Sequence, residues 1–357
     1  MRVLLCLASA AGGIGTHVAD LAASLAADGH DVHVATDPAT RARFDLPGDA
    51  PLTVAAVRDL ARGADVVHAH GFRAGLVAAV GTRRGSVLAP GETPFVISLH
   101  NQVRGAGLSP RRVVGEVAAR RVVGRADLVT GASSDLVEDA LALGARRAEL
   151  AEVPSPRVPA LLDADRERWR TAERAGFMAG HGLDPRRPVV LTLARVAPQK
   201  GLEALAGACE SSGTDAQWVL VGPGQEEIAA LVPERGVHLA GATQDVSSWL
   251  LAADVLVVPS EWEARALVVQ EAMAAGTPVV ATDVGGLPDL LHEVGVLVPP
   301  APRSTFAGRL AGAVDEVLGD PLRSSRLARA ARGRARTWDG LDASATRWAL
   351  RYAALRT

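Results

Sequence analysis

The chain alternates short apolar runs with longer amphipathic segments, and it does so twice. Residues 3–7 form the first apolar run, Val18, Leu21 and Leu25 follow at helical spacing, and Gly29 stands where a helix ends. Strands are expected at residues 3–7, 30–35, 54–57, 65–69, 94–99 and 126–130, and again at 188–193, 217–221, 237–240, 254–258, 278–281 and 296–298. Helices of the second half are expected near 202–210, 245–252, 266–275 and 305–318. Because such alternation is typical of parallel sheets covered on both faces, it predicts an α/β protein with two Rossmann-like, doubly wound domains.

A proline-rich stretch separates the two series. Pro154, Pro156 and Pro159 lie there, and a polar, arginine-rich segment expected to be helical follows at residues 163–174. A length of 357 residues also fits two domains better than one. The expected division is residues 1–160, residues 161–335 and a final helical segment at 336–357.

Composition narrows the functional class. A formal net charge of −2 gives the chain no overall basic character, so nucleic acid is not an expected partner. Cys6 and Cys209 are the only cysteines, which disfavours a disulfide framework and favours a cytoplasmic location. No apolar run reaches the roughly 18–20 residues that span a bilayer, and residues 2–8 are better interpreted as a buried strand than as a signal segment.

The loop after residues 188–193 contains the only lysine of the chain. The sequence has 38 lysine and arginine residues in total, and only one of them is a lysine. Because arginine replaces lysine elsewhere in the chain, Lys200 is a candidate for a position where a compact ammonium is needed. Arg195 precedes it in the same loop. The pair is expected to bind a pyrophosphate at the carboxyl end of a strand, and the alternative is a solvated basic turn.

A second candidate loop carries two glutamates. Glu263 follows the strand expected at 254–258, and Glu271 lies eight residues later, so helical geometry would direct both carboxylates to roughly one side. Carboxylates in such a place accept hydrogen bonds from the vicinal hydroxyls of sugars and riboses. The alternative is an ordinary helix with exposed glutamates, although the apolar neighbours of Glu271 argue against simple exposure.

The glycine-rich segment at residues 11–17 is a weaker signal. Glycines between a strand and a helix let the backbone approach a phosphate, but a plain turn explains them equally well.

Together these segments resemble the retaining glycosyltransferases of family 4, of the glycogen synthase and phosphatidylinositol mannosyltransferase type. The resemblance runs from the first strand to the C-terminus and rests on residues 12–15, 65–71, 98–101, 195–201, 221–224, 263–271 and 281–289. It implies the GT-B fold, in which two domains face each other across a cleft, and a last helix that returns to the first domain. It also implies transfer of a hexosyl-type sugar from a UDP- or GDP-linked donor, with no cofactor.

The resemblance also implies roles for individual residues. Glu271 would hold the ribose, Glu263 the donor sugar, Arg195 and Lys200 the diphosphate, and His100 would lie beside the transferred sugar. Further donor contacts are expected from Gly13, Gly15, Gly241, Ala242, Thr243, Ala264, Ala266 and Leu267. His17, His70 and Asn101 are candidates on the acceptor side. Alternatively, His70 and His100 are structural hydrogen-bonding residues at strand ends.

This chain departs from the family pattern where Ala264, Arg265 and Ala266 replace glycine, an aromatic residue and glycine. Asp289 replaces a glutamate, and the junction lacks the common Asn-Gly after its proline. These departures leave the donor sugar open. A sugar-nucleotide epimerase or a weak nucleotide-sugar-binding protein remain as alternatives, whereas a pyridoxal-dependent phosphorylase would need a lysine besides Lys200.

The sequence also bears on a metal site and on the acceptor. No Asp-x-Asp motif follows a strand, so no metal site is expected. The acceptor, whether sugar, lipid or small molecule, cannot be read from the sequence. Arg111, Arg112, Arg120, Arg121 and Arg125 lie on one helical stretch with Val113, Val114, Val117 and Val122. That stretch is either a solvated helix face or a peripheral contact with the inner membrane face.

Overall fold

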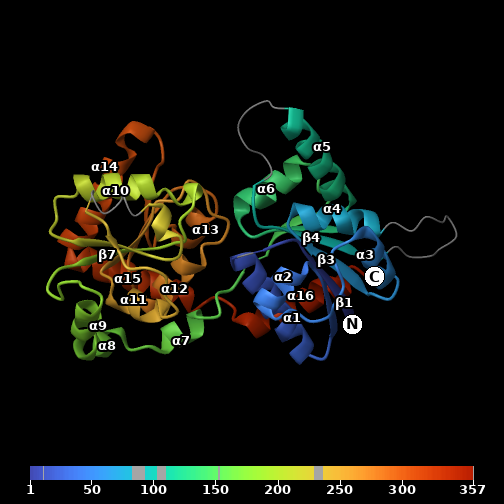
Figure 1. Cartoon of the computed structure of the whole chain (residues 1–357), viewed down its shortest axis with the longest axis horizontal. Helices are drawn as coiled ribbons and strands as arrows, with labels where there is room; N and C mark the ends of the chain where they lie inside the picture. The colour runs from blue at the N-terminus through green and yellow to red at the C-terminus, as the bar shows by residue number, and fades with distance from the viewer. Residues whose placement is uncertain (11, 83–92, 103–109, 152, 229–235, 357) are drawn as a thin grey trace. The chain divides into compact units, whose positions relative to one another are not determined.

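The computed structural model describes residues 1–10, 12–82, 93–102, 110–151, 153–228 and 236–356. The chain divides into two compact units (Figure 1). Unit 1 contains Met1–Pro154 and Asp339–Thr357, and unit 2 contains Ser155–Trp338. The C-terminal helix α16 (Leu341–Ala354) therefore belongs to the unit that the N-terminus begins.

Unit 1 forms, within the described ranges, a six-stranded parallel sheet in the order β2-β1-β3-β4-β5-β6. The strands are β1 (Arg2–Leu7), β2 (Asp31–Ala35), β3 (Val66–His70), β4 (Phe95–Leu99), β5 (Leu128–Gly131) and β6 (Ala148–Leu150). The helices are α1 (Gly13–Ala27), α2 (Pro38–Phe44), α3 (Val54–Ala61), α4 (Phe72–Gly81), α5 (Pro110–Arg125), α6 (Ser134–Ala142) and α16.

Helices α1 and α16 cover one face of this sheet. Leu21 and Leu25 of α1 pack with Trp348 and Tyr352 of α16 over alternate strand residues such as Leu5, and all are buried. On the other face, a Cβ built on Gly75 of α4 would lie 2.5 Å from Ile97 Cδ1 of β4, so the helix backbone rests directly on the sheet.

Unit 2 forms a second parallel sheet, also with six strands in its described part, in the order β12-β11-β10-β7-β8-β9. The strands are β7 (Val189–Leu193), β8 (Gln217–Val221), β9 (His238–Leu239), β10 (Val255–Val258), β11 (Val279–Thr282) and β12 (Val296–Val298). The helices are α7 (Val158–Asp163), α8 (Arg166–Ala172), α9 (Arg174–Gly180), α10 (Leu202–Ser211), α11 (Val246–Ala252), α12 (Leu267–Ala275), α13 (Leu287–Leu291), α14 (Arg303–Gly319) and α15 (Pro321–Ala335).

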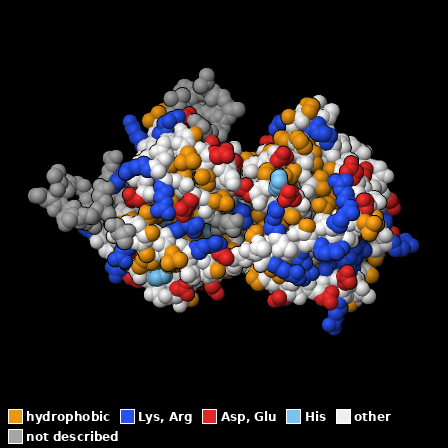
Figure 2. All heavy atoms as spheres, turned by 180° about the vertical axis from the view of Figure 1, so that it is seen from behind, with side chains coloured by type: hydrophobic (Ala, Val, Ile, Leu, Met, Phe, Trp, Pro, Cys, Tyr) orange, Lys and Arg blue, Asp and Glu red, His pale blue; other side chains and the backbone are white. Residues whose placement is uncertain are grey.

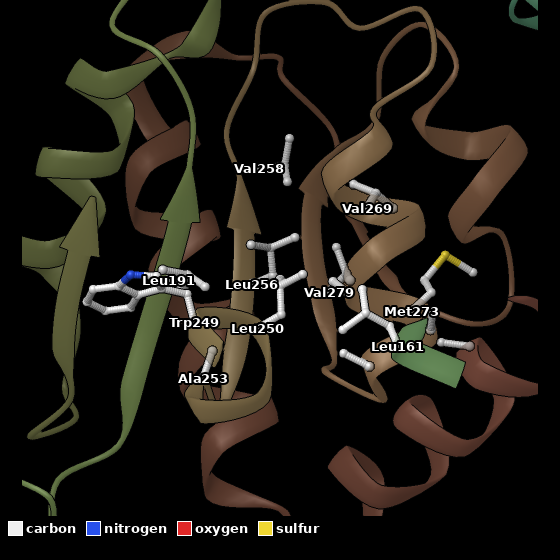
Figure 3. Packing of buried hydrophobic residues seen from close by; sticks show 14 of the residues in the cluster. Leu161, Leu191, Trp249, Leu250, Ala253, Leu256, Val258, Val269, Met273 and Val279 are labelled. Carbon is white, nitrogen blue, oxygen red and sulfur yellow. The ribbon is translucent and has the colours of Figure 1, made fainter. Parts of the chain in front are cut away.

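Alternate residues of these strands are buried against two helical layers. Helices α10 and α14 cover one face. On the other, Leu191 and Leu256 pack with Trp249 of α11 and with Val269 and Met273 of α12 (Figure 3). Basic side chains gather on the face of unit 2 that Figure 2 shows on its right, and helix α15 contains five arginines and no acidic residue.

The prediction of a doubly wound α/β architecture is confirmed, but one predicted strand is wrong. Residues 54–57 begin helix α3 rather than a strand. The Thr53 hydroxyl accepts a hydrogen bond from the Ala56 N–H at 3.2 Å and caps the helix, and Val57 and Ala61 are buried one turn apart. Among the described helices, none is long and apolar enough to cross a membrane.

Candidate active site

The strand order places two neighbouring loops at a switch point in unit 2. From β7 the chain continues outward to β8 and β9, and β10 returns to the other side of β7, with Val255 paired to Val190. The loops at residues 194–201 and 259–266 follow β7 and β10 at their carboxyl ends. In open parallel sheets this is where ligands bind.

The two loops are held tightly together. The Glu261 N–H donates to the Gln199 carbonyl at 2.9 Å. Gly201 has a φ of +62°, and a Cβ on it would lie 2.0 Å from the Pro259 carbonyl oxygen. Only glycine fits this position, both for its conformation and for the close approach.

Lys200 and Glu263 meet across these loops. Lys200 Nζ donates to Glu263 Oε1 at 2.6 Å, and Ser260 Oγ donates to the same oxygen at 2.7 Å. The side chains are 20% and 13% exposed. The Glu263 carbonyl also accepts the Gly286 N–H at 2.8 Å. An ammonium and a carboxylate are thus fixed together at the edge of the sheet.

Arg195 is exposed in the first of these loops, and no side-chain partner is found for it within the described part of the chain. No hydrogen bond or ion pair of Arg195 with Lys200 or with either glutamate is present among those residues. From the sequence, both basic residues and both glutamates were expected to contact one diphosphate sugar. In the structure, only Lys200 and Glu263 of these four are hydrogen-bonded to each other.

Glu271 lies in α12 and is 3% exposed. Its Oε1 accepts hydrogen bonds from Ser155 Oγ at 2.6 Å and from Arg157 Nη1 at 3.1 Å. Sequence reasoning missed both partners, although a buried carboxylate requires donors and a cation. As expected, Glu263 lies in the loop after β10 and Glu271 in the helix that follows. Because only Glu271 is helical, helical spacing does not determine the direction of the Glu263 carboxylate.

The other expected donor residues of unit 2 lie at the carboxyl ends of strands. Gly241, Ala242 and Thr243 follow β9, and the Gly241 N–H donates to Gln225 Oε1 at 2.8 Å. Ala264, Ala266 and Leu267 lead into α12, whose N-cap residue Ala266 provides no side-chain acceptor. The first N–H groups of α12 are therefore left without a side-chain cap.

In unit 1, strands β1 and β3 are neighbours at the corresponding switch point. Helix α1 starts at Gly13 without a side-chain cap, and Gly13 is exposed. Gly15 is buried, and a Cβ on it would lie 2.2 Å from Phe44 Cε2, so packing alone explains this glycine. Ala11 lies outside the described residues.

Histidines from three elements gather at the same edge of this sheet. His70 Nδ1 lies 3.2 Å from His100 Nε2, and the ring of His17 is centred 5.6 Å from that of His70. His68 Nδ1 contacts the Tyr352 hydroxyl and its Nε2 the Ser98 hydroxyl, both at 2.7 Å. Asn101 is exposed.

Burial keeps this histidine cluster uncharged. It lowers the pKa of His17 to about 4 and, with the help of nearby His17, the pKa of His100 to about 3. Burial and then the neighbouring histidines hold the pKa values of His68 and His70 well below the ordinary value. Near neutral pH these rings act as hydrogen-bonding groups rather than as cations. No group of three or more His, Cys, Asp and Glu side chains in the described ranges is arranged to hold a metal ion.

Comparison with known proteins gives matches along both units. Residues 12–156 match the family model described as Glycosyl transferase 4-like domain, and residues 187–320 match that of Glycosyl transferases group 1. The chain is 32% identical over 371 residues to an alpha-maltose-1-phosphate synthase of Mycolicibacterium smegmatis, with 90% of each chain covered. It is 30% identical over 393 residues to a D-inositol 3-phosphate glycosyltransferase of Xylanimonas cellulosilytica, covering 92% of this chain and 89% of that one.

Solved structures share the fold. Anabaena HepE in complex with UDP has a TM-score of 0.79 at 22% identity, covering 99% of this chain and 100% of that one. WaaG, a glycosyltransferase involved in lipopolysaccharide biosynthesis, has a TM-score of 0.70 at 19% identity over 97% and 98%.

Proposed function

The chain belongs to family 4 of the glycosyltransferases, and we propose that it transfers a sugar from a UDP- or GDP-linked donor with retention of configuration and without a metal ion. The observation that carries this proposal is the Lys200–Glu263 pair at the switch point of unit 2. An ammonium suits a diphosphate, and a carboxylate suits sugar hydroxyls. Related proteins fit the same donor chemistry, since HepE has been solved with UDP-glucose.

The donor is held by unit 2 in this proposal. Glu271 accepts hydrogen bonds from the ribose hydroxyls, and Glu263 accepts them from hydroxyls of the donor sugar. Backbone groups of residues 241–243 contact the base. Lys200 faces the diphosphate. Arg195 is exposed, and its long side chain can turn toward the diphosphate when the donor binds. Ala264, Ala266 and Leu267 offer backbone N–H groups at the start of α12.

The leaving diphosphate develops negative charge during the reaction. Lys200, Arg195 and the uncapped start of α12 stabilise this charge in place of a metal. Removing one preorganised donor of this type typically costs about 3–4 kcal/mol of transition-state stabilisation. The acceptor enters on the face that the diphosphate leaves, and a phosphate oxygen takes its proton, so no protein base is needed.

Unit 1 supplies the remaining contacts. Exposed Gly13 at the start of α1 approaches the phosphates, and His100 approaches the transferred sugar as a neutral hydrogen-bonding ring. His17, His70 and Asn101 serve the acceptor side.

A peripheral contact with an anionic membrane is part of the proposal. Val114 and Val117 of α5 are 69% and 42% exposed, and Leu76 and Val80 are exposed on the neighbouring helix α4. Arg121 is exposed on α5 as well, whereas Arg120 is paired with Glu116. The side chains of Arg111, Arg112 and Val113 lie outside the described residues. Flotation with vesicles containing phosphatidylglycerol should retain the protein at low salt, and absence of binding there rejects the contact.

Donor hydrolysis tests the enzymatic proposal without knowledge of the acceptor. Wild type is incubated with UDP-glucose or GDP-mannose, with and without EDTA, and nucleotide release is followed. Slow release that EDTA leaves unchanged is expected, and nuclear magnetic resonance should show the α-anomer of the sugar first. Release that stops in EDTA, a β-anomer, or no release from either donor would each contradict the proposal.

A further inference from the structure

The first residues of unit 2 grip the carboxylate of Glu271. Ser155 Oγ accepts the Arg157 backbone N–H at 3.3 Å and donates its own hydrogen to Glu271 Oε1 at 2.6 Å. Arg157 Nη1 donates to the same oxygen at 3.1 Å. Because its acceptor role is already occupied by the Arg157 N–H, the hydroxyl of Ser155 has a defined direction.

These contacts are supported by two packed helices. Arg157 is the N-cap residue of α7, and Leu161 of α7 is 1% exposed in the same core cluster as Met273 of α12 (Figure 3). Helices α7 and α12 therefore pack against each other and support the polar residues beside them, as binding sites require.

Both donors use Oε1 of Glu271. Within the described ranges, no hydrogen bond of Glu271 Oε2 is found, so that oxygen is left for a ligand. The Arg157 side chain is 47% exposed, and a guanidinium carries five N–H donors, most of which remain after this contact. A carboxylate oxygen of Glu271 and unused N–H donors of Arg157 therefore lie at one site.

We propose that Arg157 and Ser155 are positioning residues of the nucleotide site, and that Arg157 and Glu271 together read the vicinal diol of a ribose. A hydroxyl is both donor and acceptor, so the diol donates to Glu271 Oε2 and accepts from Arg157. This inference rests on the proposed function, in which Glu271 holds the ribose. The ligand class it selects is a ribonucleoside diphosphate over its 2′- or 3′-deoxy analogue.

The alternative is that Ser155 and Arg157 only compensate a buried carboxylate. Removal of either side chain would then lower the stability of the protein and weaken the binding of all nucleotides equally. Discrimination between ribose and deoxyribose is a readout that a purely structural role does not move.

Calorimetric titration with UDP and GDP, and with their 2′-deoxy and 3′-deoxy forms, separates these readings. We expect Arg157→Ala to bind the ribonucleotide about 10-fold more weakly, while binding of at least one deoxy form changes by less than about 2-fold. The KM for the donor should rise with the dissociation constant while kcat stays within about 3-fold. Arg157→Lys should restore part of the affinity, and Arg168→Ala, an exposed arginine of α8, is the matched control.

The outcomes are distinguishable. If Arg157→Ala weakens ribo and deoxy forms equally, or changes only thermal stability, the inference is overturned. If Arg157→Ala does not fold, Ser155→Ala carries the same test. Failure of wild type to bind UDP and GDP, or ribose discrimination that survives in Glu271→Gln, overturns the assignment of Glu271 in the proposed function itself. Loss of discrimination in Glu271→Gln but not in the Arg157 and Ser155 variants overturns this inference alone.

Discussion

Single residues of this chain show how differently lysine and arginine are used. Arginines serve largely as clamps, such as Arg41, whose guanidinium donates to the carbonyls of Val34, Pro47 and Ala50. The only lysine instead contacts a carboxylate at the switch point. A compact ammonium on a flexible stem fits there, whereas a planar guanidinium occupies more space and directs its donors differently.

Replacing Lys200 should therefore impair turnover strongly. We expect Lys200→Ala to reduce kcat/KM for donor hydrolysis about 10²- to 10³-fold, the loss typical for one preorganised donor. Lys200→Arg should restore little of it. Steady-state nucleotide release measures both, with Arg329→Ala on the exposed face of α15 as the control. Full activity of Lys200→Ala would contradict a role in catalysis.

Gly201 should tolerate no side chain. Its φ of +62° disfavours alanine, and the added Cβ would meet the Pro259 carbonyl oxygen at 2.0 Å. We expect Gly201→Ala to lower the free energy of unfolding by more than about 1–3 kcal/mol, the usual cost of backbone strain alone. Gly29→Ala is the control, because Gly29 has a φ of +80° but nothing within 4 Å of the added Cβ. Equal losses in urea denaturation would show that the close approach is not limiting.

At the scale of elements, ion pairs connect helices α8 and α9 to the sheet of unit 2. Asp254, at the start of β10, accepts hydrogen bonds from Arg170 at 2.6 Å, from Arg174 at 2.9 Å and from the Val189 N–H at 2.8 Å. Arg170 also donates to the Ala252 carbonyl at 2.9 Å, at the last residue of α11. One carboxylate thus ties two helices to neighbouring strands.

Removing this carboxylate should destabilise unit 2. Asp254→Ala leaves two half-buried guanidinium groups without a counter-charge, and we expect a loss of about 2–3 kcal/mol in the free energy of unfolding. Chemical denaturation followed by tryptophan fluorescence measures it, since Trp169 and Trp249 lie in this unit. In the exposed Asp184–Arg186 pair, Arg186→Ala should leave the midpoint unchanged.

Sequence reasoning succeeded where a single element determines its own pattern. The buried strand β8 matches the expected range at residues 217–221 because both of its faces are apolar. It failed at residues 54–57, because so short an apolar segment is compatible with both strand and helix periodicity. The cap formed by Thr53 favours the helix. β6 was missed, because its three half-buried residues give no apolar run.

The candidate site was harder to predict than the strands. The loops that carry Lys200 and Glu263 could be located, because they follow neighbouring strands. The grip of Ser155 and Arg157 on Glu271 spans more than a hundred residues of chain, and no local pattern encodes such a pairing.

At the scale of the whole molecule, the buried histidines of unit 1 should make this unit less stable at low pH. His17 and His100 are neutral when folded, but they bind protons in the unfolded chain below its ordinary pKa of 6.5. Their contribution to folding stability is therefore present above pH 6.5 and is lost as the pH drops toward the folded values of about 4 and 3. His68 and His70 act in the same direction.

Unit 1 should consequently lose its structure first on acidification. Each of His17 and His100 should cost about 2 kcal/mol of stability at pH 5 relative to pH 7.5. Hydrogen exchange with peptide resolution should show faster exchange in α1, β3 and α16 than in unit 2. His17→Gln, which cannot be protonated, should make the pH dependence shallower. Earlier unfolding of unit 2 would contradict this account.

The discontinuous make-up of unit 1 has a consequence for biosynthesis. Trp348 and Tyr352, which belong to its core, follow unit 2 in the chain and are therefore synthesised after it. Unit 2 has all its strands and helices by Trp338 and can fold while translation continues. The sheet of unit 1, whose strands are made first, therefore keeps the apolar surface that α16 covers exposed until residues 341–354 have been synthesised.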